Sequence, residues 1–206
     1  MKIASDKVEF PGTDGILAGR LDLPIVEPRA YALFAHCFTC SKDIWAAKRI
    51  ATKLADLGIA VLRFDFTGLG SSDGEFANTN FSSNVEDLVH AATFLREHHQ
   101  APALLVGHSL GGAAALSAAG RIDECEAVAT IGAPAQPEHV RHLVDGAADE
   151  IQAEGEACVD IGGRPFRVRR QFLDDLGSHS LQEYLPELNR ALLVCHAPQD
   201  NVVGIE

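Results

Sequence analysis

Apolar residues follow two different patterns from about residue 31 onward. Five short apolar runs carry little charge, as expected of parallel strands that are buried on both faces. They cover residues 31–36, 59–66, 103–106, 127–131 and 191–195. Between several of these runs, apolar residues recur at helical spacing. This alternation predicts an α/β fold, in which helices cover both faces of a mostly parallel sheet.

Two segments have the pattern of amphipathic helices that cover a sheet. The first, at 43–57, has an apolar face formed by Ala47, Ile50, Leu54 and Leu57. The second, at 83–98, has an apolar face formed by Val85, Leu88, Ala92 and Leu95. Ser83 and Glu86 are the expected capping pair of the second helix. Ahead of both, runs at 8–10 and 16–22 predict an antiparallel hairpin.

Residues 135–190 differ from the rest of the chain because they are rich in charge and poor in strand pattern. Helices are expected near 137–144 and 172–176, and a short hairpin is expected around 161–165. An insertion of this size between two core strands is typical of a small cap over a site. Residues 1–206 are therefore interpreted as a single domain with this cap insertion.

Charge and composition exclude several classes of function. The chain has 206 residues, of which 47% are hydrophobic, so it can bury a core. Its 29 acidic and 17 basic residues give a net charge of −12, which repels phosphate backbones and anionic lipids. We therefore expect neither a nucleic-acid partner nor a membrane partner. The uncharged stretch 100–120 has glycines and a serine at its centre, which favours buried elements over a membrane span.

The N-terminus and the cysteines indicate the compartment. Charges near the N-terminus exclude the apolar run of a secretory signal, so we expect a cytoplasmic protein. The number of cysteines is five, and without a secretory signal this predicts reduced thiols rather than a disulfide framework. Cys37 and Cys40 have the C-x-x-C spacing of redox centres, so a thiol-redox module is a separate hypothesis.

A nucleophile motif follows the third apolar run. Residues 107–112 read Gly-His-Ser-Leu-Gly-Gly, which is G-x-S-x-G with a strand before it and a small-residue helix after it. In this motif the serine occupies a strained turn, and glycines are needed because side chains would collide with the neighbouring strand and helix. The helix that begins at Leu110 directs its N-terminal amides toward any oxygen that becomes charged. Ser109 is therefore the candidate nucleophile.

Two further elements of acyl chemistry can be placed. Asp200 lies in a turn just after the run 191–195, where an acid could orient a catalytic base. Glu138 is the other acid considered, but nearby prolines indicate that it lies in a helix of the cap insertion. An oxyanion hole needs two convergent N–H donors. The candidates are Leu110, beside the nucleophile, and Phe38, in the loop after the run 31–36.

These motifs, in this order along the chain, resemble the α/β-hydrolase superfamily, and most of all its serine aminopeptidase S33-like branch. The motifs are the loop 36–40, the turn 64–74, the elbow 107–112 and the turn 198–200. More narrowly, the loop 36–40 and the hairpin 162–166 resemble the hydrolase half of bacterial proteins that fuse an α/β-hydrolase to an OsmC-like peroxidase domain. The resemblance implies an α/β-hydrolase fold and a C-terminal OsmC-like domain in the full-length protein.

The catalytic base is the missing element. The family order is serine, acid, histidine, yet no histidine follows Asp200, and the nine histidines present all lie elsewhere in the predicted fold. The most economical hypothesis is that the chain lacks its last helix and strand, and that the histidine lies past Glu206. Such a chain should be nearly inactive. It should also expose the strand 191–195, which would favour a homo-oligomer.

The sequence therefore predicts a serine hydrolase that acts on a small ester, thioester or amide and uses no cofactor or metal. Ser109 would attack the carbonyl, Leu110 and Phe38 would hold the oxyanion, and Asp200 would orient the histidine. The rival hypothesis is a non-catalytic scaffold or binding module joined to an OsmC-like peroxidase domain.

Overall fold

A seven-stranded sheet forms the centre of the computed structural model, which describes residues 3–205. In chain order the strands are β1 (Ala4–Gly12), β2 (Gly15–Leu23), β3 (Ala30–Ala35), β4 (Ile59–Phe64), β5 (Pro102–His108), β6 (Ala127–Ile131) and β9 (Ala191–Cys195). Their order across the sheet is β1-β2-β4-β3-β5-β6-β9. β1 pairs antiparallel with β2, and β2 with β4, whereas the other neighbours are parallel. Residues 1–2 of the charged N-terminal segment, and Glu206, lie outside the described residues.

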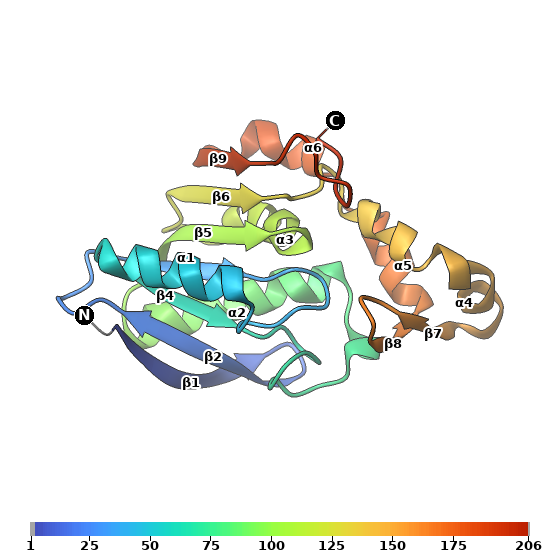
Figure 1. Cartoon of the computed structure of the whole chain (residues 1–206), viewed down its shortest axis with the longest axis horizontal. Coiled ribbons are helices and arrows are strands. Elements are labelled where there is room, and N and C mark those ends of the chain that lie inside the picture. Colours follow the sequence, from blue (N-terminus) through green and yellow to red (C-terminus); the bar gives the residue numbers. More distant parts are fainter. Residues whose placement is uncertain (1–2, 206) are drawn as a thin grey trace.

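Helices cover both faces of this sheet, which confirms the predicted α/β class (Figure 1). α1 (Trp45–Asp56) packs on one face, where Ala47 and Ala51 join a cluster with Phe34 of β3. α2 (Phe81–His98) and α3 (Leu110–Ala119) pack on the other face, where the larger part of the core lies. The uncharged stretch 100–120 forms β5, a turn and α3, as predicted. No helix within residues 3–205 is both long enough and apolar enough to cross a bilayer.

The beginning of α2 and the end of α1 differ from the sequence prediction. α2 begins at Phe81 because Asn80 caps it: the Asn80 side chain accepts from Ser83 N–H at 2.7 Å, and Ser83 Oγ accepts from Asn80 N–H at 2.9 Å. The predicted Ser83–Glu86 capping pair is therefore wrong, since Ser83 is the third residue of the helix. α1 ends at Asp56, so Leu57 lies outside its apolar face and is 52% exposed.

The segment between β6 and β9 consists of short elements that extend past the carboxyl ends of the parallel strands (Figure 1). They are the 3-10 helices η2 (Pro137–Leu143), η3 (Asp145–Ala147) and η4 (Leu185–Glu187), the helices α4 (Ala148–Glu154), α5 (Arg170–Leu176) and α6 (Leu181–Tyr184), and the hairpin of β7 (Glu156–Asp160) and β8 (Pro165–Arg169). The hairpin forms around 161–165 as the sequence predicts. A further 3-10 helix, η1 (Phe76–Asn78), precedes α2.

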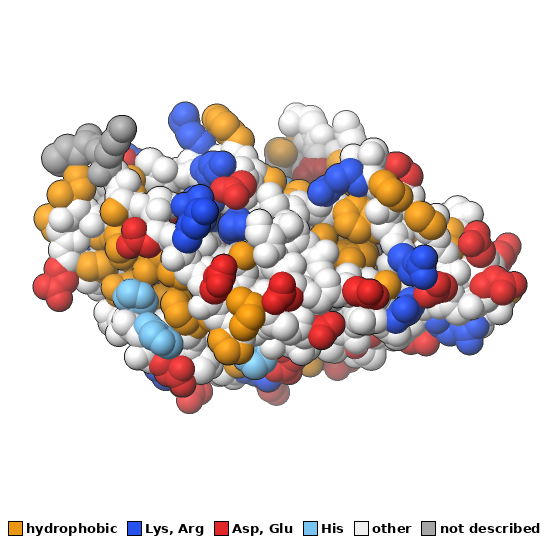
Figure 2. All heavy atoms as spheres, turned by 90° about the horizontal axis from the view of Figure 1, so that it is seen from below, with side chains coloured by type: hydrophobic (Ala, Val, Ile, Leu, Met, Phe, Trp, Pro, Cys, Tyr) orange, Lys and Arg blue, Asp and Glu red, His pale blue; other side chains and the backbone are white. Residues whose placement is uncertain are grey.

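β9 lies at one edge of the sheet, and its side chains are exposed on both faces. Leu192 is 43% exposed, Leu193 60% and Val194 61%. The predicted exposure of the strand 191–195 is therefore confirmed for the described residues. At the opposite edge, seen in Figure 2, acidic side chains are scattered among basic ones rather than gathered into one patch.

Candidate active site

Ser109 occupies the sharp turn between β5 and α3. Its backbone has φ 53° and ψ −129°, a conformation that is costly for a residue with a Cβ atom. Two hydrogen bonds hold the turn: Ser109 N–H donates to the Ile131 carbonyl at 2.9 Å, and Gly112 N–H donates to the Ser109 carbonyl at 2.8 Å. The strain at Ser109 is thus imposed by β6 on one side and by α3 on the other.

The glycines beside Ser109 are required by close backbone approach. A Cβ atom on Gly107 would lie 2.4 Å from the Gly111 carbonyl oxygen. A Cβ atom on Gly111 would lie 2.3 Å from the carbonyl oxygen of His36, which directly follows β3. Any larger residue at either position would push the turn away from the sheet. The steric reason that the sequence suggests for these glycines is therefore confirmed.

The loop of residues 36–42, hereafter the 36–42 loop, lies next to this turn. Its Phe38 side chain is only 7% exposed and stacks on Phe172 of α5, with ring centroids 5.0 Å apart. Phe76 also packs on Phe38, at 5.5 Å. The Phe38 and Leu110 N–H groups donate no hydrogen bond to any acceptor within residues 3–205. The role of these two amides as oxyanion donors stays a prediction.

A buried histidine fixes the first residue of the 36–42 loop. His36 is 1% exposed, and its Nδ1 lies 2.7 Å from the Cys37 carbonyl oxygen. Phe66 N–H donates to Nε2 at 3.4 Å, so the hydrogen bonds assign a neutral ring with its proton on Nδ1. Burial lowers the pKa of His36 to about 4, which keeps the ring neutral near pH 7. His36 therefore acts here as a structural anchor.

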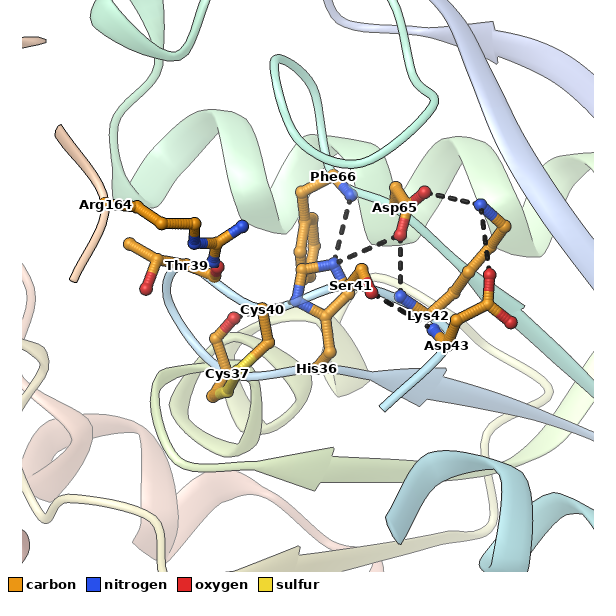
Figure 3. The surroundings of a disulfide bond; sticks show 10 residues. All are labelled: His36, Cys37, Thr39, Cys40, Ser41, Lys42, Asp43, Asp65, Phe66 and Arg164. Atoms are coloured by element: carbon orange, nitrogen blue, oxygen red, sulfur yellow. Dashed lines mark hydrogen bonds and ion pairs between the residues drawn. A yellow bond between two sulfur atoms is a disulfide. The ribbon is translucent and has the colours of Figure 1, made fainter. Parts of the chain in front are cut away.

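A buried ion pair fixes the other end of the loop. Lys42 Nζ lies 2.5 Å from Asp65 Oδ2, and Lys42 N–H donates to Asp65 Oδ1 at 2.6 Å (Figure 3). Arg63 donates to the Lys42 carbonyl at 2.6 Å and to Asp22 at 2.5 Å. Between the two anchors, the Arg164 guanidinium of the β7–β8 hairpin donates to the Thr39 carbonyl. The 36–42 loop is thus held from the sheet and from the insertion.

Asp200 lies in the turn after β9, as the sequence predicts. Its Oδ1 accepts hydrogen bonds from Val202 N–H and Val203 N–H, each at 2.9 Å. These two backbone donors lower the pKa of Asp200, so the carboxylate stays ionised at neutral pH. Asp200 Oδ2 lies 3.9 Å from His196 Nε2. Glu138, the other acid considered, lies on η2 and pairs with Arg141 at 3.0 Å.

One cavity of about 310 Å³ brings most of the predicted residues together. Ser109, Asp200 and Phe38 all border it. Leu110 is buried next to Ser109 and, with Phe38, borders a narrow gap beside Gly111. The remaining walls of the larger cavity are formed by Cys37, Thr39, His108, Gly132, His139, Val140, His142, Leu143, Val202 and Val203. The volume is at the lower end of the range of small-molecule sites.

Three histidines border this cavity, and the sequence argument missed that placement. His139 and His142 come from η2, in the predicted cap insertion, and His108 precedes Ser109. His139 Nε2 lies 2.8 Å from the Val202 carbonyl oxygen, and His142 Nδ1 lies 2.5 Å from the His139 carbonyl oxygen. Burial lowers the pKa of His108. Within residues 3–205, no histidine ring is hydrogen-bonded to Ser109.

A second serine, Ser82, lies near a histidine and an aspartate elsewhere in the fold. Its Oγ is 2.9 Å from His179 Nε2 and 2.6 Å from Asp175 Oδ1. The carboxylate and the imidazole both approach the hydroxyl, and Asp175 Oδ1 lies 3.6 Å from the same His179 nitrogen. In a catalytic triad the acid instead holds the far nitrogen of the ring. This cluster fixes the beginning of α2 to α5 and does not have triad geometry.

The structure corrects the expectation that all cysteines are reduced. Cys37 and Cys40 form a disulfide across the 36–42 loop, with their Cα atoms 5.3 Å apart. Cys125, Cys158 and Cys195 are free, as predicted. The prediction is wrong for the first pair because an odd total argues only against a framework of long-range bridges, whereas the C-x-x-C turn holds its two sulfurs together locally.

One family model and one curated protein match this chain over most of its length. The family model described as "Alpha/beta hydrolase family" matches residues 32–202. Among curated proteins, "Palmitoyl-protein thioesterase ABHD10, mitochondrial" from Mus musculus is 28% identical over 154 residues, which are 71% of this chain and 50% of that protein. The chain therefore spans about half the length of this curated relative.

Solved structures share the same architecture. The esterase domain of a Rhodothermus marinus protein is 50% identical, with a TM-score of 0.76, and the match covers 100% of this chain and 80% of that one. Est1E from Butyrivibrio proteoclasticus with bound ferulic acid is 19% identical, with a TM-score of 0.78 and coverage of 96% and 81%. At that identity the second likeness shows the fold alone.

Proposed function

The chain belongs to the alpha/beta hydrolase family, and we propose that it is a serine hydrolase of small esters or thioesters with an apolar acyl group. The observation that carries the proposal is the cavity in which strained Ser109, ionised Asp200 and the 36–42 loop meet. A serine in this backbone conformation at the end of a strand presents its hydroxyl to a substrate. This function explains why the fold keeps a strained backbone that costs stability.

Each residue then has a role in acyl transfer. Ser109 Oγ attacks the carbonyl carbon, and negative charge develops on the carbonyl oxygen. The unpaired N–H groups of Phe38 and Leu110 donate to that oxygen, and the positive end of the α3 dipole lies beside it. Asp200, kept ionised by its two backbone donors, orients the imidazole that takes the serine proton.

We assign the base to a histidine of the full-length protein outside the 206 residues. Two observations support this assignment. Within residues 3–205, the cavity histidines His139 and His142 are engaged with backbone carbonyls rather than with Ser109. The Rhodothermus esterase domain is also longer than the matched region, since the match covers 80% of it.

The walls of the cavity support an apolar acyl group. Val140, Leu143 and Val202 provide apolar surface, and the small volume favours short acyl chains. The proposal includes thioesters because the mouse relative is named as a palmitoyl-protein thioesterase, and esters because the Rhodothermus structure is named as an esterase domain. In this proposal residues 135–190 act as a cap, since Phe172 of α5 packs directly on Phe38. The S33-like branch and the OsmC-like domain remain predictions from the resemblance.

A fluorophosphonate probe tests the proposal in the full-length natural protein. We expect covalent labelling at Ser109, identified by peptide mass spectrometry, and loss of the label in Ser109→Ala. Ser178→Ala, at an exposed serine of the insertion, serves as the matched control and should label like the wild type. A folded full-length protein that never labels at Ser109 would favour a non-catalytic scaffold and would overturn the proposal.

A further inference from the structure

The Cys37–Cys40 disulfide encloses the predicted oxyanion donor. Phe38 lies inside the four-residue ring that the disulfide closes, and the only backbone hydrogen bond across this ring within the described residues runs from Cys40 N–H to the Cys37 carbonyl, at 3.1 Å. The ring lies between the two buried anchors, His36 and Lys42 (Figure 3). The position of the Phe38 N–H therefore depends on the disulfide together with the hydrogen bonds that the Cys37 carbonyl accepts from His36 Nδ1 and Cys40 N–H.

The disulfide is also accessible. Cys37 borders the same cavity as Ser109, and both cysteines are partly exposed. Accessible disulfides of this kind are the ones that exchange with thiols, in contrast to bridges buried in a core. A small thiol that enters the cavity, including the thiol released from a thioester substrate, would meet the disulfide within the site itself.

The contacts with the insertion and with Phe76 hold parts of the loop other than the donor N–H. Arg164 holds Thr39 only through its carbonyl oxygen, and the Phe38 ring is held by Phe172 and Phe76. These contacts fix the side chain of Phe38 and the far side of the turn. The peptide plane between Cys37 and Phe38, which carries the donor N–H, is held through its Cys37 carbonyl, which accepts from His36 Nδ1 at 2.7 Å and from Cys40 N–H at 3.1 Å. The second of these bonds lies inside the ring that the disulfide closes, so breaking the sulfur link removes the constraint that keeps it in place.

We propose that the Cys37–Cys40 disulfide is a reversible thiol-exchange site whose oxidised state positions the oxyanion donor. The proposal rests on the serine hydrolase function assigned to Ser109. The ligand is a low-molecular-weight thiol or a dithiol protein, and the cysteines act as positioning residues rather than as nucleophiles toward the acyl substrate.

The exchange balances in two steps. A thiolate attacks one sulfur, the S–S bond breaks, and a mixed disulfide forms while the other cysteine leaves as a thiolate and takes up a proton. A second thiolate attacks the mixed disulfide and releases the second cysteine. In sum, two thiols are oxidised to one external disulfide, and Cys37 and Cys40 gain two electrons and two protons. An external disulfide, such as oxidised glutathione, reverses the reaction.

The test uses the full-length natural protein equilibrated in glutathione buffers of graded redox ratio. Differential alkylation and mass spectrometry give the oxidised fraction of the pair, hydrogen exchange of the peptide spanning 36–42 reports loop order, and fluorophosphonate labelling reports acylation of Ser109. Loss of one oxyanion donor costs on the order of 10²–10³-fold in rate. We expect reduction of the disulfide to slow acylation of Ser109 by at least about tenfold. Reduction should also accelerate amide hydrogen exchange in the 36–42 loop, and reoxidation should reverse both effects.

Variants separate this effect from a general effect of the reductant. The Cys37→Ser/Cys40→Ser protein should have the slow rate in every buffer, whereas Cys158→Ser, at an exposed free cysteine of β7, should respond like the wild type. Equal acylation rates in oxidised and reduced protein, or equal loop exchange in both states, would overturn the inference. If Ser109 labels in neither state, the hydrolase proposal fails, and loop exchange that follows the oxidised fraction still supports the thiol-exchange site.

Discussion

Removal of the Asp65 carboxylate should destabilise the protein more than removal of its partner Lys42. Asp65 is fully buried and accepts from Lys42 Nζ at 2.5 Å, from Lys42 N–H at 2.6 Å and from Ser71 N–H at 2.9 Å. Asp65→Ala leaves a buried ammonium and two backbone donors without their acceptor. Breaking a buried pair from one side costs about 3–5 kcal/mol. That is a large part of the roughly 5–15 kcal/mol that holds a domain folded.

The reciprocal variant is predicted to cost less. In Lys42→Met the Asp65 carboxylate keeps both backbone N–H donors, and the methionine chain fills much of the lysine volume. We expect a loss of about 1–3 kcal/mol, because the carboxylate remains partly compensated by hydrogen bonds. The order of the two values, rather than either value alone, reports how Asp65 supports the 36–42 loop.

Equilibrium unfolding in guanidinium chloride, followed by far-UV circular dichroism at pH 7, measures both variants. Asp56→Ala, at an exposed acid near the end of α1, is the matched control and should stay within about 0.5 kcal/mol of the wild type. The reasoning is refuted if Asp65→Ala unfolds within 1 kcal/mol of the wild type, or if Lys42→Met is the more damaging change.

Three other outcomes follow from the geometry. Gly107→Ala forces a Cβ atom to within 2.4 Å of the Gly111 carbonyl oxygen, so it should abolish labelling of Ser109 by the fluorophosphonate probe. Gly120→Ala is the control: its Cβ atom enters open space, so this variant should label normally. Retained labelling in Gly107→Ala would contradict the elbow geometry. The pKa of His36 is about 4 in the folded protein and about 6.5 in the unfolded chain. Between these pH values the unfolded state binds more protons than the folded state. The free energy of unfolding should therefore fall by up to about 3 kcal/mol as the pH drops from 6.5 to 4. His36→Gln should flatten that dependence in urea titrations while His90→Gln should not, and equal pH dependence in all three proteins would refute the buried neutral ring. Asp200→Asn should slow acylation by on the order of 10⁴-fold without unfolding the protein, as measured by stopped-flow hydrolysis of a nitrophenyl ester, and an unchanged rate would remove Asp200 from the mechanism.

Much of the fold could be predicted because hydrophobic runs and steric motifs are local. The runs at 127–131 and 191–195 coincide with β6 and β9, since a strand buried or paired in a parallel sheet needs continuous apolar residues. The elbow could be predicted for a similar reason: a strained serine at a strand end requires glycines two residues before and after it. The apolar runs and the elbow motif each lie within one short continuous segment of the chain, so both can be recognised from the sequence.

The missed features depend on contacts between distant residues or on competing local bonds. Asn80 displaces Ser83 as the cap because its side chain reaches the Ser83 N–H, and no periodicity reports that choice. α6 has only four residues, too few to show a helical period. The stacking of Phe172 on Phe38 joins residues far apart in the chain, and the pattern of neither segment indicates it.

The disulfide shows a different limit of sequence reasoning. Counting cysteines addresses the redox compartment and the chance of long-range bridges. It does not address a turn that holds Cys37 and Cys40 with their Cα atoms 5.3 Å apart. The C-x-x-C spacing is the available signal, and the predicted oxyanion role of Phe38 already puts this loop beside the nucleophile, but neither indicates that the two sulfurs are joined.

The most direct test of the central claim is to trap the acyl-enzyme. The full-length natural protein is mixed with a short-chain nitrophenyl ester, quenched in acid within the first turnover, digested and analysed by mass spectrometry. We predict an acyl adduct on the peptide that holds Ser109, at a yield that follows the burst of nitrophenol. An adduct on Ser82, or product formation with no adduct on Ser109, would contradict the account.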